Sequence, residues 1–369
     1  MDFDLTEEQA ALAESLARLL AARYTPEARQ AAIATPLGYA PERWRDFAEM
    51  GLSALPFAES DGGLGGTAVE TMLVMEAFGR ALVVEPYLPT VVLAGNALRL
   101  GGSAAQRARW LPGIAAGGTL ATLAWAEAGR RFSTEATLRA TADSSGWRLD
   151  GAKCAVPFGD AAELLVISAN TDEGTRLFLV EGSTSGLTRR GYATMDSSHA
   201  ADLVLAGTPA DPLGGASLLD HVLDHGIAAI AAEAVGVMAE MHAMTIDYLK
   251  TRKQFGRAIG EFQVLQHRAV DMLVALEAAR SMAMFAAMTV EDSDAARRRP
   301  SLSAVKIQVA QSLRSVAQAA VQLHGGIGVT MEYRLGSYVR RATALEGLFG
   351  DHAHHLRLLA EAGGIPDQH

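Results

Sequence analysis

Over roughly the first 118 residues, apolar and polar positions alternate with a helical period. Behind a Thr6-Glu-Glu-Gln9 capping box, leucines recur every three or four residues between Leu12 and Leu20, which predicts an amphipathic helix over residues 6–24. Further helices are expected between glycine-rich and proline-containing breaks, at Pro41–Met50, Ala68–Phe78, Thr90–Leu100 and Ser103–Trp110. Residues 1–118 are therefore predicted to form an N-terminal helical domain.

Between residues 119 and 215 the pattern changes to short runs typical of β-strands. These runs are separated by turn residues and lie at Ala136–Ala142, Gly146–Leu149, Leu164–Ala169, Thr175–Val180 and Ala201–Leu205. We expect a small antiparallel β domain in the middle of the chain.

From residue 216 to residue 369 the helical period returns in three long segments, roughly Ser217–Lys250, Phe262–Thr289 and Ser301–His324. Helices longer than about 20 residues bury their apolar faces best by packing on each other as a bundle. The order helical, β, helical lacks the βαβ alternation of a doubly wound parallel sheet. The predicted fold class is therefore α+β, mainly α.

Composition narrows the classes of function. The 369 residues are 49% hydrophobic and 20% charged, which is typical of a globular protein with a large core. A net charge of -10 argues against a general electrostatic grip on nucleic acid. The single cysteine, Cys154, permits no internal disulfide and favours the cytoplasm. The most apolar run, residues 226–238, is shorter than the roughly 20 residues of a membrane span, so no membrane insertion is expected.

Two short motifs could hold an anion. In Arg252-Lys-Gln-Phe-Gly256 the planar fork of Arg252 suits a phosphate, and Phe255 could cover an aromatic ring. Gln322-Leu-His-Gly-Gly-Ile-Gly328 closes a helix on glycines that let a ligand approach the backbone. Taken alone, each motif has a simpler explanation, namely a solvated helix cap for the first and a helix stop for the second.

Several titratable residues are candidates for chemistry. Glu233 lies in a stretch that is apolar on every side, where a carboxylate is costly to bury unless it is paired. It could be catalytic, but an ion pair between helices is the simpler interpretation. His352, His354 and His355 are expected to form a hydrophilic helix face with Asp351 rather than a metal site.

Together these segments resemble the acyl-CoA dehydrogenase family along essentially the whole chain. The matching segments occur in family order and are Asp4-Leu-Thr-Glu-Glu-Gln9, Met50-Gly-Leu52, Asp61-Gly-Gly-Leu-Gly65, Leu111-Pro-Gly-Ile114, Asp150-Gly-Ala-Lys153, Arg252–Gly256 and Gln322–Gly326. The resemblance implies a helical domain (1–118), a β domain (119–215) and a four-helix bundle (216–369), assembled as a dimer of dimers around FAD. It also implies dehydrogenation of an acyl-CoA to the 2-enoyl-CoA, with a carboxylate as base, the flavin as hydride acceptor and an electron-transfer flavoprotein as the expected electron acceptor.

In this family each FAD is held by two chains. The residues that the resemblance assigns to the pyrophosphate and adenine of a neighbouring chain's FAD are Arg252, Phe255, Gln263, Gln322, Gly325 and Gly326. Trp125 and Ala126 are assigned to the chain's own flavin pocket.

That flavin pocket departs from the family pattern. Ala126-Glu-Ala-Gly-Arg-Arg131 stands where the family usually has Thr-Glu-Pro-Gly-Ala-Gly-Ser-Asp, and Ala155-Val-Pro157 replaces Trp-Ile-Thr. Pro157 has no amide hydrogen to donate. The usual base, the glutamate of Tyr-Glu-Gly, falls on Phe349, which leaves Glu346 and Glu233 as the only nearby substitutes.

This combination resembles the small subunits of heteromeric family members, such as pimeloyl-CoA dehydrogenase and the two-gene dehydrogenases of steroid side-chain breakdown. Val84-Glu-Pro-Tyr-Leu88 and the segment Leu348–His355 strengthen the likeness. We therefore expect the partner subunit of an α2β2 acyl-CoA dehydrogenase, which needs a second acyl-CoA dehydrogenase subunit. Two alternatives stay open: a homomeric enzyme with Glu346 or Glu233 as base, and a catalytically silent scaffold.

Overall fold

The computed structural model describes residues 5–144, 146–330 and 333–364. The chain divides into two compact units. The bundle unit comprises Met1–Thr25, Met72–Val83 and Ile227–His369, and the sheet unit comprises Pro26–Thr71 and Val84–Gly226. These units cut across the three predicted domains, because the first helix and most of α4 (Ala68–Ala81) belong with the bundle unit. The predicted boundaries at 118 and 215 stay a prediction.

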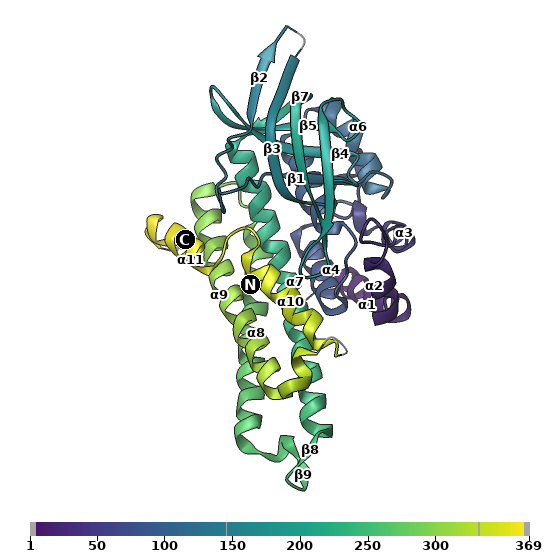
Figure 1. Cartoon of the computed structure of the whole chain (residues 1–369), viewed down its shortest axis with the longest axis vertical. Coiled ribbons are helices and arrows are strands. Elements are labelled where there is room, and N and C mark those ends of the chain that lie inside the picture. Colours follow the sequence, from purple (N-terminus) through teal and green to yellow (C-terminus); the bar gives the residue numbers. More distant parts are fainter. Residues whose placement is uncertain (1–4, 145, 331–332, 365–369) are drawn as a thin grey trace. The chain divides into compact units, whose positions relative to one another are not determined.

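The bundle unit is built on long helices (Figure 1). Its elements are α1 (Glu7–Arg23), the larger part of α4 (Ala68–Ala81) and of α7 (Ala216–Thr251), β8 (Lys253–Gln254), β9 (Arg257–Ala258), η4 (Ile259–Glu261), α8 (Gln263–Thr289), α9 (Ala295–His324), η5 (Gly325–Val329), α10 (Leu335–Gly347) and α11 (His352–Glu361). The capping box of Thr6 and Gln9 starts α1 as predicted. A side chain at Gly79 or Gly236 would collide with a backbone carbonyl of the facing helix, so α4 and α7 are in close contact there.

The start of α9 and the segment after α7 differ from the sequence-based expectation. α9 begins at Ala295 rather than Ser301, because the Asp294 side chain accepts a hydrogen bond from the Ala296 amide and the helix continues through Pro300. The segment after α7, for which no strand is predicted, forms the short β8–β9 hairpin.

Helices α7 and α8 are long and apolar enough to cross a membrane by length and composition alone, with a mean hydropathy of 1.5 and 1.3 in their most apolar 18 residues. The expectation based on residues 226–238 was therefore too narrow, because that run is only part of α7. All of the apolar window of α7 is buried inside the chain, which is typical of a core helix.

The sheet unit contains a seven-stranded sheet and short helices. The strands are β1 (Ala121–Ala124), β2 (Arg139–Asp143), β3 (Gly146–Pro157), β4 (Leu164–Thr171), β5 (Gly174–Glu181), β6 (Leu187–Ala193) and β7 (His199–Gly215). The helical segments are α2 (Pro26–Ile33), α3 (Pro41–Glu49), η1 (Leu52–Ala54), η2 (Glu59–Asp61), η3 (Leu88–Gly95), α5 (Asn96–Gly101) and α6 (Ala104–Ala115). The expected helix over Thr90–Leu100 is divided, since η3 is a π-helix that continues into α5.

The strands pair in the order β1-β4-β2-β3-β7-β5, with β6 on β7 and an additional pairing of β5 with β4. Most pairs are antiparallel, as expected, but β1 runs parallel to β4. The inward-facing side chains form one apolar core that includes Leu149, Leu165 and Phe178.

Candidate functional site

The β8–β9 hairpin presents an aromatic ring to the outside of the bundle unit. Its turn residues Phe255 and Gly256 have φ values of 55° and 82°, and two positive values in a row are typical of a type I′ hairpin turn. Glycine adopts this conformation freely, whereas phenylalanine is strained in it. The Phe255 side chain is nevertheless 91% exposed. Backbone strain combined with exposure of a large apolar ring marks Phe255 as a candidate for binding.

A second aromatic ring contacts Phe255, and exposed cationic and amide side chains lie on the adjoining helix ends. The Phe255 ring meets the edge of Phe262 at 6.2 Å, and the Arg257 guanidinium lies 4.1 Å from the centre of the Phe262 ring. Arg252, directly after α7, and Gln263, at the start of α8, are both exposed. Within the described residues neither side chain has a hydrogen-bond partner, so both are available to a ligand.

The C-terminal end of α9 also has groups that are exposed to solvent. Gln322 is exposed, and the helix stops at Gly325, whose amide donates to the carbonyls of Val321 and Gln322. This is the helix-stop geometry that the glycines predicted. A Cβ atom at Gly325 or Gly326 would meet nothing within 4 Å. Packing inside the described chain therefore does not require glycine at Gly326, and the backbone stays open to close approach.

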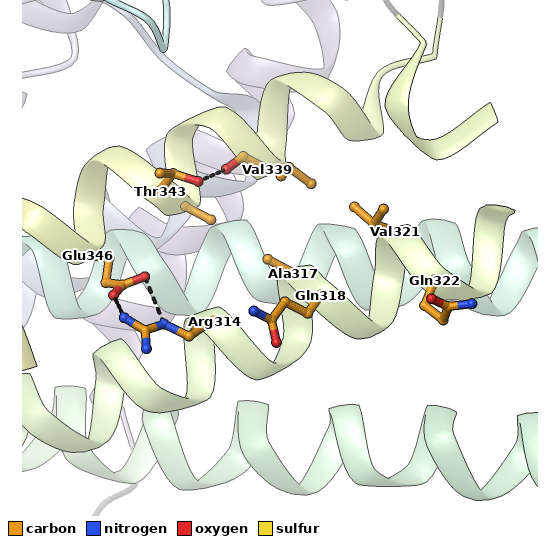
Figure 2. A pocket seen from close by; sticks show the side chains of 9 residues that line it. Arg314, Ala317, Gln318, Val321, Gln322, Val339, Thr343 and Glu346 are labelled. Atoms are coloured by element: carbon orange, nitrogen blue, oxygen red, sulfur yellow. Dashed lines mark hydrogen bonds and ion pairs between the residues drawn. The ribbon is translucent and has the colours of Figure 1, made fainter. Parts of the chain in front are cut away.

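A pocket of about 440 Å³ continues from Gln322 along the groove between α9 and α10. Figure 2 shows Gln322 at one end of this groove and Arg314 with Glu346 at the other. The lining combines apolar with polar side chains, namely Arg314, Ala317, Gln318, Val321, Gln322, Val339, Ala342, Thr343 and Glu346.

Both carboxylates proposed as substitute bases are held by arginines. Arg341 donates to the two oxygens of Glu233 at 2.5 and 2.8 Å, and the Glu233 side chain is only 5% exposed. This is the ion pair between helices that the sequence favoured over a catalytic role. Glu346 accepts two hydrogen bonds from Arg314. In both pairs the guanidinium occupies the carboxylate oxygens through which a base would take up a proton.

The loop at the family's base position is fixed by buried basic residues. Phe349 has a φ of 57° and is 9% exposed, and its carbonyl oxygen lies 2.9 Å from Nε2 of His355. The ammonium group of Lys306 donates to the carbonyls of Leu345 at 2.7 Å and Glu346 at 3.2 Å. Burial lowers the pKa of Lys306 to about 7, although Glu346 and Asp351 oppose this.

The prediction of a hydrophilic histidine face is wrong for His355. α11 packs on α9, so His355 is 3% exposed, and its Nδ1 lies 3.2 Å from the Ser303 hydroxyl. Burial lowers its pKa to about 4, because a charged imidazole would lose its hydration there. Among the described residues no group of His, Cys, Asp and Glu side chains could hold a metal ion.

In the sheet unit, the segment at Ala155 and Pro157 has few free hydrogen-bond donors. The Cys154 amide donates to Ala126 at 3.0 Å, and the Ala155 amide donates to Asp202 at 3.2 Å. The β3–β7 register shifts between Lys153 and Val156, and Ala155 has a φ of 50° at this irregularity. The backbone amides at positions 154 and 155 are engaged within the chain, and proline offers none.

A buried ion pair holds the segment after β1, where Trp125 and Ala126 lie. Lys153 donates to Glu127 at 2.7 Å, to Ser168 at 2.8 Å and to the Trp125 carbonyl at 3.3 Å. Burial alone would raise the pKa of Glu127, but hydrogen bonds from Lys153 and Thr137 outweigh it and lower the pKa to about 2.

Sequence reasoning missed these buried basic residues. Lys153 lies in a motif that was used only to identify the family resemblance. Lys306 lies in a segment that was analysed only for its helical periodicity. A lysine at an inward position of a strand or helix is the signal that could have identified both, because buried charges need partners.

Comparison with known proteins agrees with this architecture. The profile of the acyl-CoA dehydrogenase N-terminal domain matches residues 6–118, and that of the C-terminal domain matches residues 214–364. Acyl-CoA dehydrogenase IpdE2 from Mycolicibacterium smegmatis is 30% identical over 359 residues, which covers 96% of this chain and 98% of the relative.

Two solved structures are similar over nearly the whole length. The Tcur3481-Tcur3483 steroid ACAD G363A variant has a TM-score of 0.91 and 30% identity, and covers 96% of this chain and 97% of its own. The ChsE4-ChsE5 complex from Mycobacterium tuberculosis has a TM-score of 0.91 and 28% identity, with both chains fully covered. These matches confirm the resemblance and the fold class predicted from the sequence. The chain therefore belongs to the acyl-CoA dehydrogenase family.

Proposed function

We propose that this chain is the partner subunit of an α2β2 acyl-CoA dehydrogenase, which oxidises an acyl-CoA thioester to the 2-enoyl-CoA with FAD as cofactor. In this arrangement the chain holds the adenine and pyrophosphate of an FAD whose flavin is bound by a second acyl-CoA dehydrogenase subunit. The similarity to the ChsE4-ChsE5 complex and to Tcur3481-Tcur3483 supports a heteromeric assembly.

The observation that carries the proposal is a difference between two sets of side chains: one set has no partner among the described residues, and the other is held in ion pairs. Arg252 and Gln322 are exposed without a side-chain partner among the described residues, and Phe255 is strained and exposed. By contrast, Glu233 and Glu346 are paired with arginines. The groups that can bind a ligand are therefore those assigned to another chain's cofactor.

The residues of the bundle unit fit the nucleotide half of FAD. A guanidinium such as that of Arg252 pairs well with a phosphate, Phe255 offers a ring face to adenine, and Gln322 and Gln263 offer amides. The open backbone at Gly326 allows close approach of an anion. FAD, when bound, supplies the hydride acceptor of the reaction.

The segment at Trp125, Ala126 and Ala155–Pro157 fits the flavin half poorly. The Cys154 and Ala155 amides are engaged, Pro157 has none, and the Thr122 hydroxyl donates to the Pro157 carbonyl at 2.7 Å. Flavin recognition needs donors aimed at its polar edge. We therefore assign the flavin of the working site to the other subunit.

The proton acceptor is also assigned to the other subunit. Phe349 has no basic atom, and its loop is fixed by His355 and Lys306. A base needs a free oxygen within reach of the substrate carbon. Arg341 and Arg314 occupy the carboxylate oxygens of Glu233 and Glu346.

The remaining assignments follow from the same family chemistry. We propose an acyl-CoA with a dicarboxylic or polycyclic acyl group as the substrate of the complex, in line with the similarity to a steroid acyl-CoA dehydrogenase. An electron-transfer flavoprotein is the proposed electron acceptor, and the cytoplasm is the proposed compartment.

Expression with and without its partner tests the proposal. The chain should purify colourless and inactive alone, and should become yellow and active with acyl-CoA when co-expressed with a second acyl-CoA dehydrogenase subunit. A lone chain that is yellow and active, and that loses activity in Glu346→Gln or Glu233→Gln, would instead support a homomeric enzyme. If Arg252→Ala leaves the FAD content and turnover of the complex unchanged, the chain is only a scaffold.

A further inference from the structure

Three aromatic rings meet between the two parts of the proposed nucleotide site. The rings of Tyr248 and His324 stack with centroids 4.6 Å apart and an interplanar angle of 26°. His324 also contacts Tyr333, with ring centroids 5.2 Å apart and an interplanar angle of 48°. Tyr248 lies four residues before Arg252 on α7, and His324 lies two residues after Gln322 on α9. The rings therefore join the ends of two helices, each beside a residue proposed to bind FAD.

The central histidine is held firmly on one side only. His324 is 3% exposed, and its Nδ1 lies 2.9 Å from the Ala320 carbonyl of its own helix. Its Nε2 is buried, and no hydrogen bond of this atom within the described residues meets the usual limits of distance and angle. The backbone of Met244 on α7 is nevertheless close enough to interact with the imidazole. A buried polar atom without a full partner is costly, and a plain core position would be filled more favourably by an apolar ring.

Other contacts fix the third ring. Tyr333 is followed by Arg334, which donates to the Tyr338 hydroxyl at 3.1 Å and lies 3.7 Å from Glu240 of α7. The Tyr338 hydroxyl in turn donates to the Arg80 carbonyl at 2.6 Å. The start of α10 is thereby tied to α4 and α7, so Tyr333 offers a fixed surface to His324.

The helix ends beyond the rings are held by local backbone hydrogen bonds. The Arg252 amide donates to the Tyr248 carbonyl at 2.9 Å, the Ile259 amide donates to the Arg252 carbonyl at 2.8 Å, and the Gly325 amide donates to Val321 and Gln322. None of these bonds links the end of α7 to the end of α9. The side chains of Arg252 and Gln322 project to solvent. Their relative placement therefore depends on how firmly Tyr248 and His324 are packed.

From this geometry we propose that Tyr248, His324 and Tyr333 are positioning residues for nucleotide binding, whose stacked rings hold Arg252 and Gln322 in register for one dinucleotide. This inference rests on the proposed function and adds three residues to it. None of the three is required to touch FAD, so their effect passes through Arg252 and Gln322.

FAD affinity of the reconstituted complex tests this role. We expect His324→Ala to raise the dissociation constant of FAD about tenfold, and His324→Phe, which keeps a ring in the stack, to raise it much less. The same loss is expected for Tyr248→Leu. Because the stack acts through Arg252, adding His324→Ala to Arg252→Ala should weaken FAD binding by less than twofold more, roughly. Thermal unfolding of each variant separates lost affinity from lost folding.

Hydrogen exchange gives a readout that does not involve the cofactor. In the FAD-free complex, His324→Ala should speed exchange of the Arg252 and Gly325 amides, and leave amides in the middle of α8 unchanged. If exchange at these amides is unchanged, or the losses of affinity simply add in the double variant, the positioning role is overturned. If Arg252→Ala itself leaves FAD affinity unchanged while exchange responds as expected, the failure lies in the proposed function, and the stack is then only structural.

Discussion

The two halves of α9 use polar side chains in opposite ways. In the first half, Lys306 and Ser303 are buried and contact the chain's own carbonyls or hydrogen-bonding groups. Near the C-terminal end of the helix, 16 residues or about 24 Å beyond Lys306, Gln322 is exposed beside an open glycine backbone. Lys306 and Ser303 have partners within the chain, whereas the Gln322 amide offers hydrogen bonds that nothing in the described chain accepts.

This difference distinguishes the side chains of α9 that stabilise the fold from those that are available to a ligand. Buried donors that are matched hold the Phe349 loop in place. An exposed donor such as the Gln322 amide contributes little to folding, which agrees with the ligand-binding role proposed for it. The contrast yields four predictions about variants of this chain.

Glu233→Ala should have the largest effect on stability. It leaves the guanidinium of Arg341, itself only 16% exposed, without its bidentate partner. Loss of one member of a buried pair costs about 3 kcal/mol of the free energy of unfolding. Chemical denaturation of the complex measures this. Glu240→Ala is the matched control, because its contact with Arg334 is longer and more exposed and should contribute under about 1 kcal/mol. Equal effects would show that burial of Glu233 does not matter.

Acidification should destabilise the fold, because His355, which packs against the first half of α9, is buried in its neutral form. Its folded pKa of about 4 lies below the unfolded value of 6.5, so the unfolded state takes up the proton first. The stability contribution is fully present above pH 6.5 and falls by roughly 2 kcal/mol as the pH drops towards 4. Lys306, His354 and Asp351 also interact electrostatically with this imidazole: Lys306 and His354 lower its pKa further, and Asp351 raises it.

His355→Gln should flatten this pH dependence of the melting temperature, since glutamine keeps a donor but does not titrate. His267→Gln, at an exposed position of α8, is the control and should leave the slope unchanged. A slope that is the same in all three proteins would remove His355 as its source.

Replacement of the strained turn residue should raise stability and lower affinity together. Phe255→Gly relieves a positive φ, which we expect to stabilise the fold by about 1 kcal/mol. The same change removes the ring proposed to cover adenine and should weaken FAD binding. Melting temperature and FAD titration on the same samples check both signs. A variant that loses stability, or that keeps full affinity, contradicts the role given to the hairpin.

Glu346→Gln should have the smallest effect. Since the base is assigned to the other subunit, turnover of the complex should change by less than about twofold. The comparison variant is Arg314→Gln, which frees Glu346 and should be equally mild. A loss of turnover above a hundredfold in Glu346→Gln would return the role of base to this carboxylate.

The sequence predicted the architecture well because the long helices and the alternating strands carry strong periodic signals. Two strands were missed for a physical reason: β6 is largely exposed and rich in polar residues, and β1 is a short run buried on both faces. The β8–β9 hairpin and the π-helix η3 have no periodic signal of their own.

The candidate site was predicted less completely, because its chemistry depends on partners distant in the sequence. Arg341 lies 108 residues from Glu233, and Arg314 lies 32 residues from Glu346. The burial of His355 depends on α11 packing against α9. Motifs identified Arg252, Phe255 and Gln322 as candidates, but only coordinates could show that they are exposed.

The most direct measurement is the FAD dissociation constant of the heteromeric complex with Arg252→Ala in this chain alone. Loss of one guanidinium–phosphate contact predicts a rise of about tenfold to a hundredfold. Lys250→Ala, an exposed cation two residues earlier, should leave the constant within about twofold. An unchanged constant in Arg252→Ala, or an equal change in both variants, would contradict the claim that this chain holds a cofactor belonging to its partner.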